Sequence, residues 1–403
     1  MEEMIKSVFR SMSSVKLPQK KFILSLLTVL SLFQGKATFR NMSRYSGYDE
    51  KTFSRWYRKF FAFTDFNRLL LTENLLNKQE LIAVIDASFM NKSGRHTEGL
   101  GWFYSGCAGK SIKGLEISTI AVVDMAANTA YSLDTRQTLD TTEEKTDAEE
   151  TRITQYADQV INSLPHLKAL GITYLAQDAF YSKKKFVAPV CKTGLHVVGK
   201  LRGDANLKYL YTGKHQGRGR PKKFAGKVDV LSELSSWDQE SNLEKNVQVY
   251  SKVVWSVCFK RKIKVVILRR QEGDAIGQAI LFSTDLNLST EILIGYYKAR
   301  FQIEFVFRDA KQYTGLMDCQ ALRKEAIHTH VNASLLCLNL LKLEDRKHGQ
   351  HTGQKVISIA TWKRKKFNQQ LIEVIFDKLG VDQKSHKISD IYRELSDYGA
   401  IAA

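Results

Sequence analysis

The stretch YKARFQIEFVFRDAK, residues 297–311, decides how the rest of this chain is interpreted. Its polar members include Tyr297, Arg300, Glu304 and Lys311. At about 100° per residue, an α-helix would bring these four side chains within about 60° of one another. A carboxylate between two cations suits the handling of phosphate and a metal ion. The simpler interpretation is a half-buried helix with a solvated charged stripe, and the other segments decide between the two.

The composition favours a polyanionic partner. The 403 residues include 61 Lys and Arg against 42 Asp and Glu, a net charge of +19. Such an excess makes nucleic acid the first expectation and a membrane surface the competing one. No apolar run reaches the about 18 residues of a spanning helix, and the N-terminus lacks the basic-then-apolar order of a signal peptide. We expect a soluble, cytoplasmic protein that is associated with the nucleoid and has no membrane partner.

Residues 1–78 are expected to form a helical, DNA-binding N-terminal domain. Two short helical segments, 39–45 and 49–60, flank a Ser-Gly-Tyr turn, which is the layout of a helix-turn-helix. The second segment carries cations that could reach phosphates or base edges, among them Lys51, Arg55 and Arg58. An ordinary helical hairpin in a basic protein would show the same pattern.

Two aspartates lie near the ends of apolar runs. LIAVIDASF, residues 81–89, is typical of a strand buried on both faces and contains Asp86. Residues 172–182 repeat the pattern with Asp178 near the end. A carboxylate in such a place is costly unless it is paired or functional. If the strands are neighbours and the helix of Glu304 packs beside them, three carboxylates converge as ligands of the kind that Mg²⁺ and Mn²⁺ prefer. With 42 acids in the chain, a chance selection of three is the alternative.

The order of predicted elements gives a mixed α/β fold. The first part of the central domain, residues 79–202, is expected to contain strands at 81–89, 115–125, 129–139, 172–182 and 195–202, with helices at 143–163 and about 183–192. Residues 203–288 form a β-rich insertion. A long helix at 289–314 and an apolar helix at 326–343 complete the domain as residues 289–343. Residues 344–403 are a basic, helical C-terminal tail.

The spacing Tyr297-x₂-Arg300-x₃-Glu304-x₆-Lys311 matches the Y-R-E-K signature of the DDE transposases of bacterial insertion sequences. The element order also resembles their ribonuclease H-like catalytic domain, in which a β-rich insertion precedes the Glu-bearing helix. Asp-Ala-Ser at 86–88 and Asp-Ala-Phe-Tyr at 178–181 resemble the two Asp blocks of the family. The resemblance covers roughly residues 80–340. One departure is Phe301, because the family often has Trp directly after the signature Arg.

The resemblance assigns roles to the residues that match. It implies a catalytic and metal-binding triad made of Asp86, Asp178 and Glu304. It implies contacts with DNA phosphates near the transposon end for Tyr297, Arg300 and Lys311. The cofactor implied is Mg²⁺ or Mn²⁺, as two ions. The partners implied are the inverted-repeat ends and target DNA, held by a homodimer in the synaptic complex.

A basic loop inside the insertion gives a second DNA signal. Residues 214–223 are KHQGRGRPKK, and their core with Arg218 and Arg220 is similar to an AT-hook. Such an extended basic strand can lie in a narrow minor groove. The alternative is a solvated basic loop between two strands.

The sequence therefore predicts a transposase that cleaves DNA at insertion-sequence ends and joins them to target DNA. The chemistry would be phosphodiester hydrolysis and transesterification at two metal ions. Two alternatives stay open, namely a DNA-binding regulator of the same fold without catalysis and a metal-dependent nuclease without strand transfer.

Overall fold

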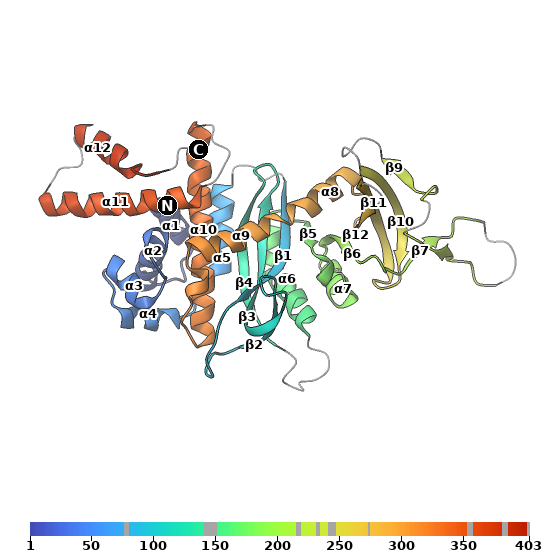
Figure 1. Ribbon diagram of the computed structural model, residues 1–403, viewed down its shortest axis with the longest axis horizontal. Helices are drawn as coiled ribbons and strands as arrows, with labels where there is room; N and C mark the ends of the chain where they lie inside the picture. The colour runs from blue at the N-terminus through green and yellow to red at the C-terminus, as the bar shows by residue number, and fades with distance from the viewer. Residues whose placement is uncertain are drawn as a thin grey trace.

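The computed structural model is an elongated molecule with helices at one end, a central sheet, and a β-rich arm at the other end (Figure 1). The structure describes residues 1–75, 80–140, 151–214, 219–230, 234–240, 247–272, 275–352, 358–380 and 386–400. Within these ranges, no helix has both the length and the apolar character needed to cross a membrane.

The secondary structure comprises α-helices, three short 3-10 helices and strands. The α-helices are α1 (Glu2–Ser11), α2 (Leu17–Leu32), α3 (Phe39–Met42), α4 (Glu50–Tyr57), α5 (Phe63–Asn74), α6 (Arg152–Ala169), α7 (Lys184–Lys192), α8 (Thr290–Ala299), α9 (Gln302–Tyr313), α10 (Lys324–Thr352), α11 (Ile359–Leu379) and α12 (His386–Ser396). The 3-10 helices are η1 (Ser43–Tyr45), η2 (Ala179–Tyr181) and η3 (Leu316–Asp318). The strands are β1 (Leu81–Met90), β2 (Gly101–Ser105), β3 (Lys110–Asp124), β4 (Thr129–Thr138), β5 (Tyr174–Gln177), β6 (His196–Leu201), β7 (Leu207–Leu210), β8 (Phe224–Lys227), β9 (Asp238–Glu240), β10 (Val247–Ser256), β11 (Arg261–Glu272) and β12 (Ala275–Ser283).

The central part of the sheet has the strand order β4–β3–β1–β5–β6. Strands β1, β5 and β6 run parallel, while β3 is antiparallel to β1 and to β4. Parallel strands are covered on both faces, which explains the uninterrupted apolar start of β1. The predicted strands are confirmed, although β5 ends at Gln177 and is shorter than residues 172–182. The strand β2 is not among the strands predicted from the sequence.

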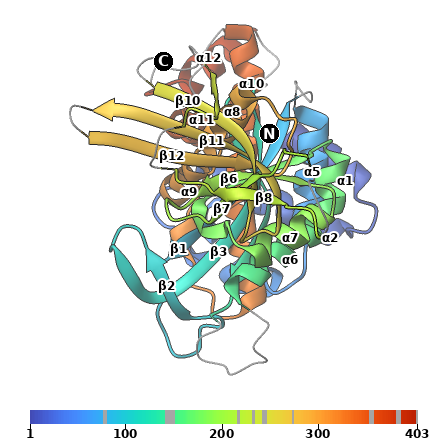
Figure 2. The same cartoon turned by 90° about the vertical axis from the view of Figure 1, so that its right-hand side faces the viewer.

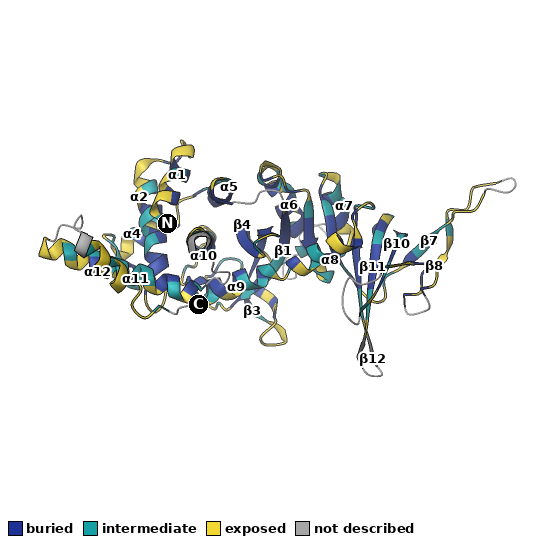
Figure 3. Cartoon of the chain, turned by 90° about the horizontal axis from the view of Figure 1, so that it is seen from above, coloured by how far each residue is buried: buried dark blue, intermediate teal, exposed yellow. Residues whose placement is uncertain are grey.

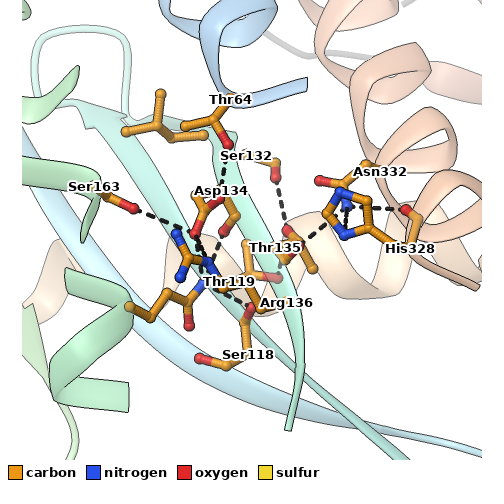
Figure 4. A network of polar contacts seen from close by, with 12 residues as sticks. Thr64, Ser118, Thr119, Ser132, Asp134, Thr135, Arg136, Ser163, His328 and Asn332 are labelled. Carbon is orange, nitrogen blue, oxygen red and sulfur yellow. Dashed lines mark hydrogen bonds and ion pairs between the residues drawn. The ribbon is translucent and has the colours of Figure 1, made fainter. Parts of the chain in front are cut away.

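Polar side chains of α10 form hydrogen bonds with the backbone groups along the free edge of β4. Asn339 Oδ1 accepts the Ser132 N–H at 2.9 Å, and its Nδ2 donates to the Ser132 carbonyl at 2.7 Å. Asn332 Nδ2 donates to the Thr135 carbonyl at 3.1 Å (Figure 4). Unpaired backbone groups at a buried sheet edge would be costly, and these amides remove the cost. This requirement explains why an otherwise apolar helix carries buried asparagines.

A buried carboxylate fastens the helical end to the sheet. The Asp134 carboxylate of β4 accepts hydrogen bonds from Thr64 Oγ1 of α5 at 2.7 Å and from Ser163 Oγ of α6 at 3.2 Å (Figure 4). Buried apolar side chains form one cluster from Met4 in α1 to Trp362 in α11. The N-terminal helices and α11 thus share a core with the sheet, and the domain borders proposed from the sequence stay predictions.

The β-rich insertion extends the central sheet. Strand β12 pairs antiparallel with β6, with Ile280 opposite Leu201, and β11, β10 and β7 follow in order. Strands β10, β11 and β12 fall within residues 203–288, the segment that the sequence predicts to be rich in strands. Figure 2 shows these strands projecting together from the central sheet. Figure 3 shows burial concentrated in the sheet and the helices packed on it, whereas α12 and the β7–β8 hairpin are largely exposed.

Candidate active site

Asp86 and Asp178 lie at the same level on neighbouring parallel strands. In the pairing of β1 with β5, Ile85 is opposite Gln177, so the next residue on each chain is an aspartate. Asp178 follows the last residue of β5 and begins the 3-10 helix η2. Asp86 Oδ1 accepts the N–H of Ala87 at 2.8 Å, which helps to fix its rotamer. The two strands therefore bring together the two acids that are far apart in the sequence.

The long helix predicted at residues 289–314 is wrong in one respect. It consists of α8 and α9, which are separated by a turn at Arg300 and Phe301. At the break the N–H groups of Arg300 and Glu304 bond to carbonyls three residues earlier, which is the tighter 3-10 pattern. Because the helix is interrupted, the stripe of four polar side chains is not continuous.

Arg300 links two of the acids at this break. Its Nη1 is 3.4 Å from Asp86 Oδ2, and its Nη2 is 3.3 Å from Glu304 Oε1. Its Nε is buried and has no hydrogen-bond partner among the described residues. The guanidinium carbon lies 5.9 Å from the centre of the Tyr297 ring. The first three residues of the Tyr-Arg-Glu-Lys spacing thus lie close to Asp86 of β1 and to Asp178, which follows β5.

Burial has the largest effect on the pKa values of Asp86 and Arg300. Burial raises the pKa of Asp86 to about 6, and the nearby carboxylates of Asp178 and Glu304 add to this effect. The Ala87 N–H and the Arg300 guanidinium act in the opposite direction. Burial alone would lower the pKa of Arg300, but the surrounding acids raise it overall. Arg300 therefore interacts electrostatically with all three acids, Asp86, Asp178 and Glu304.

The donor set suits a divalent cation in its chemistry. Within the described residues, no three His, Cys, Asp or Glu side chains already form a cluster that could hold a metal ion. However, Asp86, Asp178 and Glu304 offer the hard oxygen atoms that Mg²⁺ and Mn²⁺ prefer. Burial, with Asp178 and Glu304 nearby, raises the pKa of Asp86 despite Arg300, and a bound divalent cation would favour its charged form. The residues therefore fit divalent ions, although their side chains must draw closer to share them.

Lys311 lies apart from the acids, two turns further along α9. It lines a separate hollow together with Lys363 and Arg364 of α11. Burial lowers the pKa of the Lys311 ammonium. The Cys107 side chain in the β2–β3 turn acts on that pKa in the opposite direction. The structure thus divides the four signature residues into a group of three and a lysine elsewhere.

The predicted helix-turn-helix segments are helical where expected. Helix α3 and the 3-10 helix η1 form the first segment, and α4 forms the second. Asp49 caps α4, because its Oδ1 accepts the Thr52 N–H at 2.7 Å. Lys51, Arg55 and Arg58 are exposed, whereas Phe53 and Tyr57 of the same helix are buried. The three cations are therefore free of the protein core, and their contact with DNA stays a prediction.

The AT-hook-like segment connects β7 to β8. Arg220 is exposed beyond Gly219, whose φ of 119° only glycine adopts readily. Arg218 lies outside the described residues. Figure 3 shows β7 and β8 at the outer end of the β-rich arm, away from α9. Any DNA contact made here would involve a different part of the DNA from the one at Asp86.

The hairpin of β2 and β3 was missed from the sequence. Burial alternates along β2, so Phe103 is inside while Trp102 and Tyr104 are 52% and 61% exposed. The run of three aromatic residues in GWFYS, a residue type enriched in strands, was the signal that could have found this strand. Figure 2 shows the hairpin projecting from the sheet.

The sequence pattern of the family described as transposase DDE domain matches residues 77–340. This match covers well over half of the chain, and the chain belongs to that family. Membership implies, in general, an enzyme that cuts DNA and depends on divalent metal ions. The matched residues contain Asp86, Asp178 and the whole of α8 and α9.

The other comparisons add little. No curated protein matches this chain. Among solved structures, the chain is similar to the NurA nuclease from Sulfolobus solfataricus, at 10% identity and a TM-score of 0.25, over 68% of this chain and 85% of the nuclease. A likeness at this level carries no argument about fold or function.

Proposed function

We propose that this chain is a transposase of the insertion-sequence type with the Y-R-E-K signature. It would cleave DNA at the element ends and join those ends to target DNA. The observation that carries the proposal is the meeting of Asp86, Asp178 and Glu304 around Arg300 in a member of the transposase DDE domain family. The strand order β4–β3–β1–β5–β6 supports a ribonuclease H-like core for this site.

Asp86, Asp178 and Glu304 would hold two divalent ions. When bound, such ions activate an attacking oxygen and stabilise a leaving one in phosphodiester chemistry. In the first step, water attacks the phosphorus at the element end, and the bond to the 3′ oxygen breaks to leave a 3′-hydroxyl. In the second step, that hydroxyl attacks a target phosphodiester, so one P–O bond forms and one breaks.

The remaining residues of the site would position the DNA. Tyr297 and Arg300 lie beside the acids, and a guanidinium can bind two oxygens of one phosphate at once. In the free protein Arg300 holds Asp86 and Glu304 at 3.4 and 3.3 Å, which keeps the like charges from repelling one another. On binding DNA, the arginine would exchange carboxylate partners for phosphate oxygens. The exposed cations of α4 and the basic β7–β8 connection would hold DNA further from the cleavage point.

Two other functions use the same fold. A DNA-binding regulator would need the basic surfaces but none of the acids, and a nuclease would need the acids without strand transfer. The desolvation of Asp86 disfavours the regulator. A desolvated acid near two others destabilises the fold, and a role in catalysis would explain why the chain keeps it. Synapsis of two ends would require a homodimer in the active complex.

The decisive experiment compares Asp86→Asn, Asp178→Asn and Glu304→Gln with the wild type. Each variant is given Mg²⁺, duplex DNA carrying the inverted repeats that flank the gene, and a target plasmid. We expect each to lose at least about a hundredfold in cleavage and to keep its affinity for the duplex. Glu291→Gln, an exposed acid of α8, is the matched control.

The products separate the three functions. Joined product from the wild type supports a transposase, cut ends without joining support a nuclease, and binding without cutting supports a regulator. Near wild-type cleavage by any one of the three acid variants would remove that residue from the proposed triad.

A further inference from the structure

A hollow of about 390 Å³ lies where three distant segments meet. Its walls come from the connection after α2, from the end of α9, and from the start of α11. The lining includes the cations Lys311, Lys363 and Arg364, with Asp318 as the only acid among the lining residues. One Asp318 oxygen accepts the Ala37 N–H at 2.8 Å, so this acid is already engaged by the backbone.

The cations of the hollow are poorly neutralised. Lys311 has neither a hydrogen bond nor an ion pair with any described residue, although it is half-buried. Lys363 is 9% exposed, its Nζ donates to the Tyr313 carbonyl at 2.6 Å, and it lies 3.7 Å from the centre of the Phe33 ring. Arg364 is exposed at the rim. Burying ammonium groups costs free energy that an anion in the hollow would return.

We propose that this hollow binds a phosphate of the DNA backbone and that α11 is therefore part of the DNA path. Lys311 would supply one positive charge to this phosphate, and Lys363 and Arg364 would supply the others. The hollow would hold the strand at a second point, because Lys311 is seven residues beyond Glu304, or about 10 Å along α9. Measured along the axis of duplex DNA, that length corresponds to about three nucleotides of one strand.

The position of the hollow favours DNA over a free anion. The connection after α2 leads directly into α3 and α4, the predicted helix-turn-helix, while α9 leads back to the acids. A strand that leaves the acids along α9 would reach the hollow at the end of that helix. This inference rests on the proposed function, because it takes the DNA path from the catalytic site.

The test measures DNA binding by the full chain in EDTA, so that no cleavage occurs. A fluorescein-labelled duplex is titrated with the wild type, Lys311→Gln, Arg364→Gln and the double variant at several salt concentrations. Each single variant should weaken binding about threefold to tenfold. The slope of log K against log salt, which is negative, should become shallower by up to about 0.9. Lys378→Gln, an exposed cation at the other end of α11, should change neither quantity.

The double variant is the sharp part of the test. If both cations grip one phosphate, the slope lost in the double variant stays close to about 0.9, since the slope counts phosphates and not cations. Full additivity of the two losses, or an equal loss in Lys378→Gln, would mean only a general charge effect and would overturn the proposal.

Inorganic phosphate distinguishes the two sources of anion. Competition of inorganic phosphate with the duplex that is lost in Arg364→Gln supports a shared site. Calorimetric binding of phosphate without any change in duplex affinity between the wild type and Arg364→Gln overturns a role in the DNA path. Wild-type cleavage with Mg²⁺ is measured separately, so its absence would refute the proposed function while the binding data still judge the hollow.

Discussion

The two ends of the segment from Tyr297 to Lys311 have opposite electrostatic characters. At the first end a single guanidinium is shared between Asp86 and Glu304, with Asp178 nearby, so acids outnumber the cation. At the second end Lys311 shares a hollow with two more cations and one acid. One end suits added cations and the other suits added anions. A sequence stripe that looks uniform thus divides into two sites with different ligands.

The break between α8 and α9 separates these sites. The 3-10 turn at Arg300 and Phe301 places the guanidinium between the acids of β1 and α9. Lys311 then lies at the far end of α9, where α11 packs. The comparison predicts that substitutions at the acidic end change catalysis strongly, whereas substitutions at the basic end change DNA affinity by smaller amounts.

The largest effect is expected for Arg300→Ala. Its loss leaves Asp86 without the cation that lowers its pKa, and it removes a bidentate donor for phosphate. We expect cleavage to fall at least about a hundredfold, or about 2.7 kcal/mol of barrier. The pH at which cleavage reaches half its maximum should also rise, since the Asp86 carboxyl would keep its proton to higher pH.

Arg300→Lys is the control for charge alone. A lysine keeps the positive charge but lacks the planar fork that reaches two carboxylates at once. Cleavage close to that of Arg300→Ala would show that the fork matters, while recovery to the wild-type rate would contradict the bridging role.

Much of the acidic end could be predicted from the sequence. The apolar run before Asp86 indicated a buried strand, and Asp178 followed a second such run, but only the structure shows that the two strands are neighbours. Parallel pairing then required the two acids to meet. The edge-capping asparagines of α10 were not predictable in the same way, because the need for Asn339 arises only when β4 lies beside that helix.

The basic end could not be assembled from the sequence. Lys363 was visible only as part of a basic run in the tail, and nothing local indicates that it packs against Tyr313 and Phe33. The helix break at Phe301 was equally hidden, since the residues around it have no Pro or Gly to end a helix. Contacts between distant segments, rather than local propensity, decide both features.

An intermediate effect is expected on stability for Asp86→Asn. The folded-state pKa of Asp86, about 6, lies above its ordinary value of 3.8, so the folded protein holds the proton more tightly than the unfolded chain. The stability contributed by the protonated group is complete below about pH 4 and is lost as the pH rises through 6. A shift of about two units corresponds to about 3 kcal/mol. After allowing for the weakened Arg300 pair, we expect the variant to be more stable than the wild type by about 2 kcal/mol at pH 8.

The measurement is urea unfolding in EDTA at pH 4 and pH 8. Most of the advantage of Asp86→Asn should disappear at pH 4, where the folded wild-type carboxyl is neutral and the unfolded one is close to its titration midpoint of 3.8. Added Mg²⁺ should shrink the advantage at pH 8, because an ion that binds only the folded wild type stabilises it. An advantage that is equal at both pH values would show that burial of the charge is not its cause.

The smallest effect is expected for the pH dependence of DNA affinity at the basic end. Burial lowers the pKa of Lys363 to about 8, so its ammonium loses charge between pH 7 and pH 9. Duplex affinity in EDTA should fall about threefold over this range in the wild type. Lys363→Arg keeps its charge and should flatten the dependence. Burial also lowers the pKa of Lys342 to about 8, and this lysine lies in a different hollow. An unchanged pH dependence in Lys363→Arg would point to another titrating group, such as Lys342, and would remove Lys363 from the DNA path. The contrast between the two ends would then rest on Lys311 and Arg364.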